Sequence, residues 1–249
     1  MAGRGWSFAE KGMTDHPVLA TIASMATAIG IIAGGLITIL TAIGIEYLRR
    51  PVLQLIIETP PLDLPSPSNP AKIRRHLRLK LQNEPLPKIW RWTQRAAALQ
   101  CRGEITFHNL DGQAFFDRAM AVRWASAPEP IASQIVDPAE PQEPKFFILD
   151  FARAATESRT DVYPGEEEVL DVAVRFDDEA DCYGWNNDSY FYNWRNPNWR
   201  LPRERYLIKV VVTSSGQKCV GKFRLINNVD SRADFRLTEL LPEDRAKRF

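Results

Sequence analysis

The sequence predicts a mainly β protein, an antiparallel immunoglobulin-like β-sandwich preceded by one N-terminal transmembrane α-helix. One long uncharged run lies near the N-terminus of the 249-residue chain. The segments after it alternate between apolar and polar residues, and no convincing amphipathic helix interrupts them. We therefore expect an N-terminal tail at 1–16, a transmembrane helix at 17–48, a juxtamembrane segment at 49–71, a β-sandwich at 72–240 and a C-terminal tail at 241–249.

The uncharged run extends from Val18 to Ile45 and contains 28 residues. A helix rises ~1.5 Å per residue, so about 20 residues cross a hydrocarbon core of ~30 Å. The run is about twice as long as the apolar region of a cleavable signal peptide, and it lacks the charged face of an interfacial helix. We expect a permanent single-pass anchor in the lipid bilayer, with a cleaved signal or a buried core helix as the alternatives.

Gly30 and Gly34 form a GxxxG pair within this run, and Ala26 extends the same small-residue face by one turn. Such a face lets two membrane helices approach closely, which favours self-association. Glycine is also common in membrane helices that do not associate, so ordinary composition is the alternative explanation.

The side of the membrane is indicated by the flanking charges. Arg49 and Arg50 follow the run, with further basic residues after them, whereas the short N-terminal tail carries little net charge. This favours a cytoplasmic C-terminal domain, with the opposite topology as the alternative.

The widely spaced Cys101, Cys182 and Cys219 are not a disulfide framework. We expect Cys101 and Cys219 to be buried, with a bridge between them as the alternative.

Strands are predicted from period-two alternation. The clearest case places Leu77, Leu79 and Leu81 on one face and basic or polar residues on the other. Ser214-Ser215-Gly216 joins 206–213 to 217–226 as a hairpin, and Asp111-Gly112 predicts a second turn. The same alternation recurs at Ile105/Phe107, Met120/Val122/Trp124, Leu170/Val172/Val174/Phe176 and Tyr206/Ile208/Val210/Val212.

The connections favour a sandwich, because they contain Pro, Gly and Asn and no intervening helix. The immunoglobulin cysteine signature is absent, since 206–213 contains no cysteine. The proline-rich segment 59–70 is expected to be a spacer, and 127–144 a surface excursion.

Catalytic motifs are absent from the sequence. Its three histidines, His16, His76 and His108, have no metal-binding spacing, and there is no CxxC or GxSxG motif. Residues 216–222 match GxxxxGK, but Phe223 replaces the hydroxyl residue of a phosphate-binding loop. We therefore predict no catalytic residue, no metal ligand and no cofactor. The net charge of +1 gives no electrostatic case for nucleic acid as a partner.

An acidic run, Asp177-Asp178-Glu179 with Asp181, follows one predicted strand. Several carboxylates together are the ligands that Ca²⁺ prefers. The spacing does not match a known calcium loop, so we favour a solvated acidic turn.

The most distinctive segment is 183–199, which contains seven aromatic residues in seventeen and is interleaved with asparagines. Aromatic rings beside amides are typical of recognition surfaces for proteins or glycans. Two alternatives are a cap whose rings form a secondary core, and a belt of rings at the membrane interface. The predicted binding residues are Tyr183, Trp185, Asn186, Asn187, Tyr190, Tyr192, Trp194 and Trp199.

Together these features predict a membrane-anchored β-sandwich with a binding or structural role, more in keeping with a non-enzyme than with an enzyme. The first alternative is a membrane-tethered enzyme or metal-binding domain whose site assembles only in three dimensions, around the acidic run and the asparagines. The second is an accessory subunit of a membrane complex.

Overall fold

The structure is a computed structural model that describes residues 17–66, 69–90, 92–137, 140–156, 158–177, 179–228, 230–247 and 249. The chain divides into two compact units, Met1–Leu48 and Arg49–Phe249. The N-terminal tail predicted at 1–16 lies outside the described residues.

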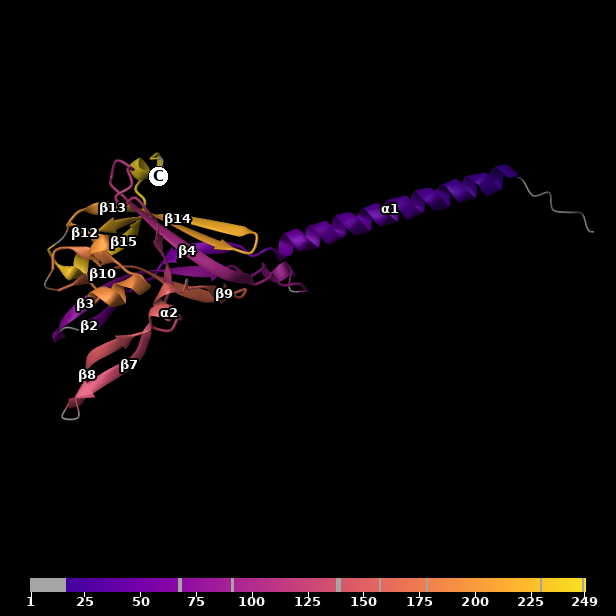
Figure 1. The fold of residues 1–249 in the computed structure, drawn as a ribbon. Helices are drawn as coiled ribbons and strands as arrows, with labels where there is room; N and C mark the ends of the chain where they lie inside the picture. Colours follow the sequence, from indigo (N-terminus) through magenta and orange to yellow (C-terminus); the bar gives the residue numbers. More distant parts are fainter. Residues whose placement is uncertain are drawn as a thin grey trace, which may run out of the picture. The chain divides into compact units, whose positions relative to one another are not determined.

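Helix α1 (Pro17–Arg49, indigo in Figure 1) is long and apolar enough to cross a membrane from Thr27 to Arg49. The Thr38 and Thr41 hydroxyls donate to backbone carbonyls one turn earlier, each at 2.8 Å. These polar groups are therefore satisfied within the helix, as a lipid environment requires. Apart from the adjacent residues and the helix's own backbone, no described atom lies within 4 Å of a Cβ built on Gly30 or Gly34. That face is open, and helix self-association stays a prediction.

The second unit contains antiparallel sheets, and the larger has seven strands in the order β1-β3-β10-β11-β12, with β2 on β3 and β6 on β10. These strands are β1 (Leu53–Ile57), β2 (Leu62–Ser66), β3 (Asn69–Asn83), β6 (Arg123–Trp124), β10 (Glu167–Phe176), β11 (Cys182–Gly184) and β12 (Arg200–Leu201).

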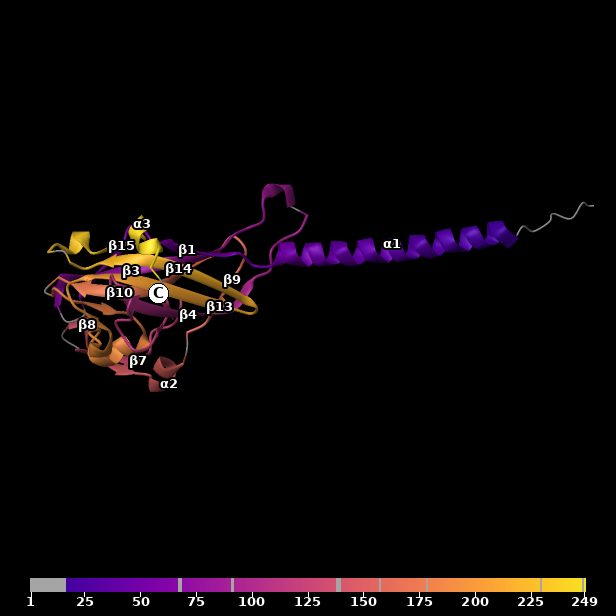
Figure 2. The ribbon, with the colours of Figure 1, turned by 90° about the horizontal axis from the view of Figure 1, so that it is seen from above.

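The second sheet has six strands in the order β15-β14-β13-β4-β5, with β9 on β4. Figure 2 shows β4, β13 and β14 running side by side. The expected hairpin is confirmed, because β13 and β14 pair from Arg205↔Ile226 to Ser214↔Gln217. The strands are β4 (Ala98–His108), β5 (Met120–Ala121), β9 (Thr160–Val162), β13 (Arg205–Ser214), β14 (Gln217–Ile226) and β15 (Arg236–Glu239).

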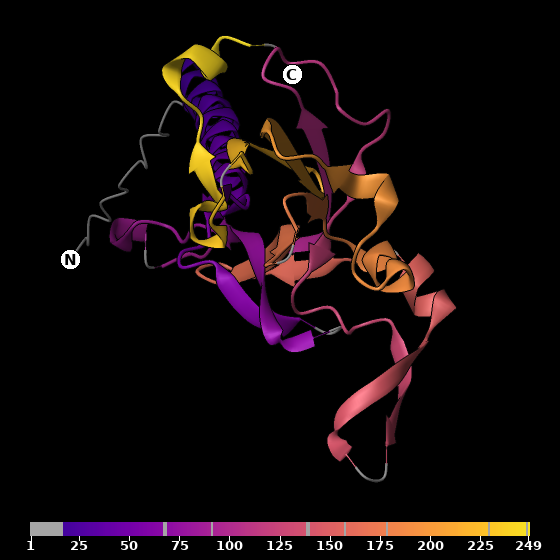
Figure 3. The same cartoon turned by 90° about the vertical axis from the view of Figure 1, so that its left-hand side faces the viewer.

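A separate hairpin of β7 (Ile131–Asp137) and β8 (Glu140–Leu149) forms the pink arm in Figures 1 and 3. The remaining elements are short helices: η1 (Lys88–Trp90), α2 (Phe151–Ala155), η2 (Asn187–Tyr192), η3 (Pro197–Trp199), η4 (Arg232–Asp234) and α3 (Pro242–Arg245).

Both sheets contribute to one hydrophobic core. Leu77, Leu79 and Leu81 of β3 are buried as the alternation predicts, and they share the core with Ile208 and Val210 of β13. The prediction of a mainly β protein with antiparallel sheets and an N-terminal apolar helix is confirmed. Cys101 is buried and Cys219 is half-buried, and both are free thiols.

Segment 49–71, including the expected spacer at 59–70, contributes strands to the larger sheet, which corrects the expectation of a spacer. Strands β1 and β2 lie in this segment, and both pair with β3. Leu53, Leu55 and Ile57 alternate with polar or more exposed residues and pack against the core, so the segment buries an apolar face of its own. Pro65 is tolerated because β2 is an edge strand.

Three other segments differ in their secondary structure from what the sequence indicated. The Asp111-Gly112 turn forms, with Gly112 at φ 92°, but only an isolated bridge between His108 and Ala114 follows it. The expected tail 241–249 contains α3, whose Asp244 is buried and lies 3.4 Å from Arg224 of β14. The expected excursion at 127–144 contains β7 and the start of β8.

Candidate functional site

The rings of segment 183–199 are mostly buried, which corrects the expectation of an exposed aromatic surface. Trp185 is 3% exposed, Tyr190 7% and Trp194 9%, and they pack with Val174 and Phe176 of β10 as a second hydrophobic cluster. Trp199 belongs to the main core. The driving force is burial of the large apolar area that each ring carries. The segment is therefore a cap on the sheet, one of the alternatives that the sequence left open.

The asparagines of the cap shape its backbone. The Asn186 N–H donates to Ser189 Oγ at 3.2 Å, and that hydroxyl lies 3.3 Å from Asn186 Oδ1, a reciprocal link at the start of η2. Asn196 Oδ1 accepts from the Asn198 N–H at 3.0 Å at the start of η3. Asn193 has φ 50°, in the left-handed region that asparagine tolerates better than most residues. Asn186, Asn193 and Asn196 therefore stand at the ends of short helices.

Beneath the cap lies a basic cluster, which consists of Arg74, His76 and Arg78 of β3, Arg123 of β6 and Asp171 of β10. Asp171 faces Arg78 on one neighbouring strand and Arg123 on the other. Its carboxylate accepts from Arg78 Nε at 2.9 Å and from Arg123 Nη1 at 3.2 Å. The cluster is therefore a cross-strand ion triad with two further basic side chains beside it.

The cap rests on this cluster through its rings. The Arg74 guanidinium lies 5.7 Å from the centroid of the Trp185 ring and 5.9 Å from that of Trp194. The His76 ring meets Trp185 edge-on at 4.9 Å, and Arg123 lies 5.8 Å from the Tyr190 ring. Cation–π contacts strengthen when they are shielded from water, so these contacts stabilise the cap on the sheet.

Burial sets the charge states of the cluster. Desolvation, with a smaller contribution from Arg74, lowers the pKa of His76 well below its ordinary value, so His76 is neutral at physiological pH. Burial raises the pKa of Asp171, and the neighbouring Arg78 and Arg123 oppose part of that rise. Neither ring nitrogen of His76 has a hydrogen-bond partner among the described residues. His76 is thus a packing group for Trp185 and is not exposed for proton transfer.

A pocket of about 210 Å³ opens beside the cap and is the candidate binding site. Asn187 is one of its lining residues, and its Oδ1 is buried with no hydrogen-bond partner in the described structure. The exposed Asp188 accepts from Asn186 Nδ2 at 3.4 Å. Carbonyl and carboxylate oxygens accept hydrogen bonds, so the pocket suits a donor such as an amide N–H, an ammonium group or a hydroxyl. Its lining residues are Ala121, Val122, Ala154, Ala155, Thr156, Ser158, Asn186, Asn187 and Asp188.

The predicted binding residues therefore separate into groups. Asn186 and Asn187 line the pocket, and Tyr192, 44% exposed, ends the same short helix η2. Tyr183 is half-buried, and its hydroxyl donates to Glu179 at 2.7 Å. Burial and this contact raise the pKa of Tyr183. The structure assigns the remaining four rings, Trp185, Tyr190, Trp194 and Trp199, to packing.

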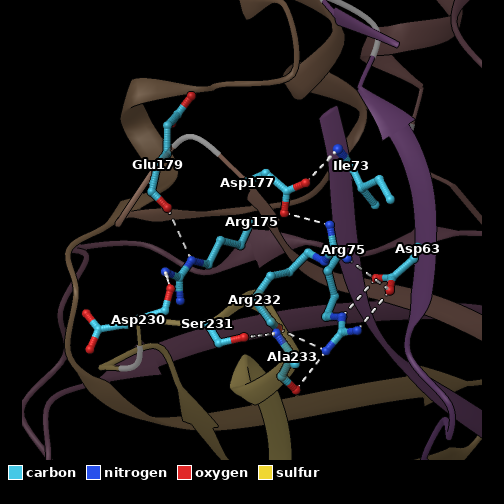
Figure 4. Close-up of polar contacts among 10 residues, drawn as sticks. All are labelled: Asp63, Ile73, Arg75, Arg175, Asp177, Glu179, Asp230, Ser231, Arg232 and Ala233. Carbon is cyan, nitrogen blue, oxygen red and sulfur yellow. Dashed lines mark hydrogen bonds and ion pairs between the residues drawn. The ribbon is translucent and has the colours of Figure 1, made fainter. Parts of the chain in front are cut away.

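The acidic run pairs with arginines. Figure 4 shows Asp177 beside Arg232, whereas the contact drawn for Glu179 joins Arg175 Nε to the Glu179 backbone carbonyl. Asp177 contacts Arg232 at 2.6 Å and accepts from the Ile73 N–H at 2.9 Å. Glu179 pairs with Arg195, and Asp181 accepts from Arg200 at 2.6 Å. Asp178 lies outside the described residues. Within the described chain, no group of three or more His, Cys, Asp or Glu side chains is arranged to hold a metal ion.

The arginines in Figure 4 join distant segments. Arg75 of β3 makes two contacts of 2.8 Å with Asp63 of β2 and also donates to the carbonyls of Arg232 and Ala233 in η4. The Asp63 contact lowers the pKa of that carboxyl. This network fastens η4 to the edge of the larger sheet, a structural role.

No protein-family model, curated protein or solved structure matches this chain. Function is therefore argued from the side chains that the fold brings together. Sequence reasoning missed the basic cluster, although one signal was present: Arg74, His76 and Arg78 occupy successive outward positions of β3.

Proposed function

We propose that the chain is a single-pass membrane-anchored binding module whose β-sandwich presents the pocket beside η2 to a protein partner. The observation that carries the proposal is the pocket itself, where the exposed Asp188 lies beside Asn186 and Asn187. The carboxylate of Asp188 accepts hydrogen bonds and is exposed, so a ligand N–H or O–H can bind there. Tyr192 supplies an exposed ring on the same helix.

The strand order supports an immunoglobulin-like sandwich. In constant-type immunoglobulin domains the sheets are ABED and CFG. Here β1-β3-β10-β6 follows the first order and β4-β13-β14 the second. The Tyr206 hydroxyl near the start of β13 donates to the Pro202 carbonyl at 3.0 Å, as in a tyrosine corner. Ile208 occupies the place of the second cysteine, so we propose a variant of this fold without the disulfide.

Helix α1 supports membrane anchorage, and Arg49 and Arg50 after it favour a cytoplasmic domain. A cytoplasmic position makes a protein partner the better match than an extracellular glycan. Backbone N–H groups and lysine side chains of such a partner offer the donors that the pocket lacks.

Site-specific photocrosslinking tests this function. A benzophenone amino acid at position 192, in cells that make the full chain, should give a discrete crosslinked species. Replacing Asn187 and Asp188 with alanine should abolish that species, because it removes the oxygens that the partner contacts. The control position is Val220, which is 47% exposed on β14. Equal crosslinking at positions 192 and 220, or a species at 192 that survives the double replacement, contradicts the proposal.

A further inference from the structure

We propose that the loop between β3 and β4, described at 85–90 and 92–95, inserts the side chains of Ile89, Trp90 and Trp92 into the interfacial region of the bilayer that α1 spans. The inference rests on the membrane anchor of the proposed function. It concerns a different surface from the pocket beside η2 and adds a second contact between the protein and the membrane.

The loop exposes apolar side chains to an unusual extent. Ile89 is 80% exposed and Trp92 63%, and the Trp90 ring, 36% exposed, lies 5.9 Å from that of Trp92. Among the tryptophans in the described part of the chain, Trp90 and Trp92 alone are not buried. A cluster of large apolar side chains left in water marks a surface that contacts a membrane or a partner.

Both ends of the loop are fixed beside the point where the chain enters the second unit. At one end, the Glu84 N–H donates to the Val52 carbonyl at 2.9 Å. At the other, Arg95 Nη1 donates to the Arg50 carbonyl at 3.0 Å, and the Ala96 N–H donates to the Arg49 carbonyl.

Arg49 directly follows Leu48, the last residue of the first unit. The covalent chain therefore holds this end of the domain close to the place where an inserted α1 leaves the bilayer.

The composition of the loop suits a bilayer interface better than a protein partner. Tryptophan and tyrosine concentrate at membrane–water interfaces because their rings are apolar with one polar edge. Tyr163, 53% exposed, lines an open pocket of about 540 Å³ together with Trp90 of the loop. Lys88 is exposed on the same loop, and basic side chains near a bilayer are attracted to anionic headgroups.

A fluorescent label at position 89 tests the insertion in the full chain. The background is Cys219→Ser, because Cys219 is the half-buried thiol whereas Cys101 and Cys182 are buried. Ile89→Cys carries an environment-sensitive nitrobenzoxadiazole label, and Tyr192→Cys carries the same label as the matched control. The proteins are placed in vesicles of phosphatidylcholine and phosphatidylserine, with and without bromine on the acyl chains.

The label at position 89 should emit at shorter wavelength than the label at 192 and lose intensity in brominated vesicles, whereas the label at 192 should show neither effect. A blue-shifted label at 89 that bromine does not quench would mean that protein covers the loop, such as a second copy, and would overturn the proposal. A water-like emission at 89 would overturn it as well. Alkaline extraction of the same vesicles separates the two claims: release of the chain contradicts the anchor, whereas retention without quenching contradicts the loop insertion alone.

Discussion

Replacing Asp171 with alanine is expected to lower the free energy of unfolding by about 3–5 kcal/mol, the cost of breaking a buried ion pair by removing one partner. Asp171 is 1% exposed and is the carboxylate that contacts both Arg78 and Arg123. Without it, Arg123, itself 5% exposed, loses the carboxylate with which it pairs. Denaturant unfolding of the full chain in detergent, followed by near-ultraviolet circular dichroism, measures the loss.

Glu167→Ala is the matched control for this replacement. Glu167 lies on the same strand and contacts Lys80 at 2.6 Å, but its side chain is 50% exposed. Solvent screens such a pair, so little change in the unfolding midpoint is expected. Asp171→Asn keeps the shape and removes the charge, and it should also destabilise. An Asp171→Ala protein as stable as the Glu167→Ala protein would show that the buried triad does not stabilise the fold.

Replacing Trp185 with alanine is expected to cost about 3–5 kcal/mol of stability, as for other buried aromatic residues truncated to alanine. Trp185 is 3% exposed and packs with Tyr190 at 5.6 Å between ring centroids. Its loss leaves a cavity and removes the ring on which Arg74 and His76 rest. The same denaturant experiment measures the effect.

Tyr192→Ala is the control, because Tyr192 belongs to the same segment and is 44% exposed. Its stability should change by less than about 0.5 kcal/mol, the usual range for surface substitutions. If Trp185→Ala instead unfolds like the unsubstituted chain and abolishes the crosslink from position 192, the ring is a contact residue and the segment is not a cap.

Alternation in the sequence was enough to predict the core face of the larger sheet and the main hairpin of the other. Leu77, Leu79 and Leu81 repeat at period two, and burial of one face of a strand determines that pattern. The turn of the main hairpin could be predicted as well, because it depends on a local glycine: Gly216 has φ 80°. The length of the uncharged run was enough by itself to predict α1.

The cap could not be predicted in the same way. In the sequence, the polar side of β3 looks like a solvated face that contains Arg74, His76 and Arg78. Period-two alternation distinguishes the two sides of a strand, but it does not show what covers the polar side. The covering segment follows more than a hundred residues later. The short strands β11 and β12 could not be predicted for a related reason, since two or three residues are too few to show alternation.

Oxidative footprinting tests the central claim most directly, namely that segment 183–199 is a cap whose rings pack inward and leave the pocket as the contact surface. Brief exposure of the full chain in detergent to hydroxyl radicals, read by mass spectrometry, measures the accessibility of each ring. Trp185 and Trp194 should be oxidised as slowly as Trp124, which is fully buried. After correction for the intrinsic reactivity of each ring type, they should also be oxidised far more slowly than Tyr192. Oxidation of Trp185 and Trp194 at the accessibility of Tyr192 would contradict the account.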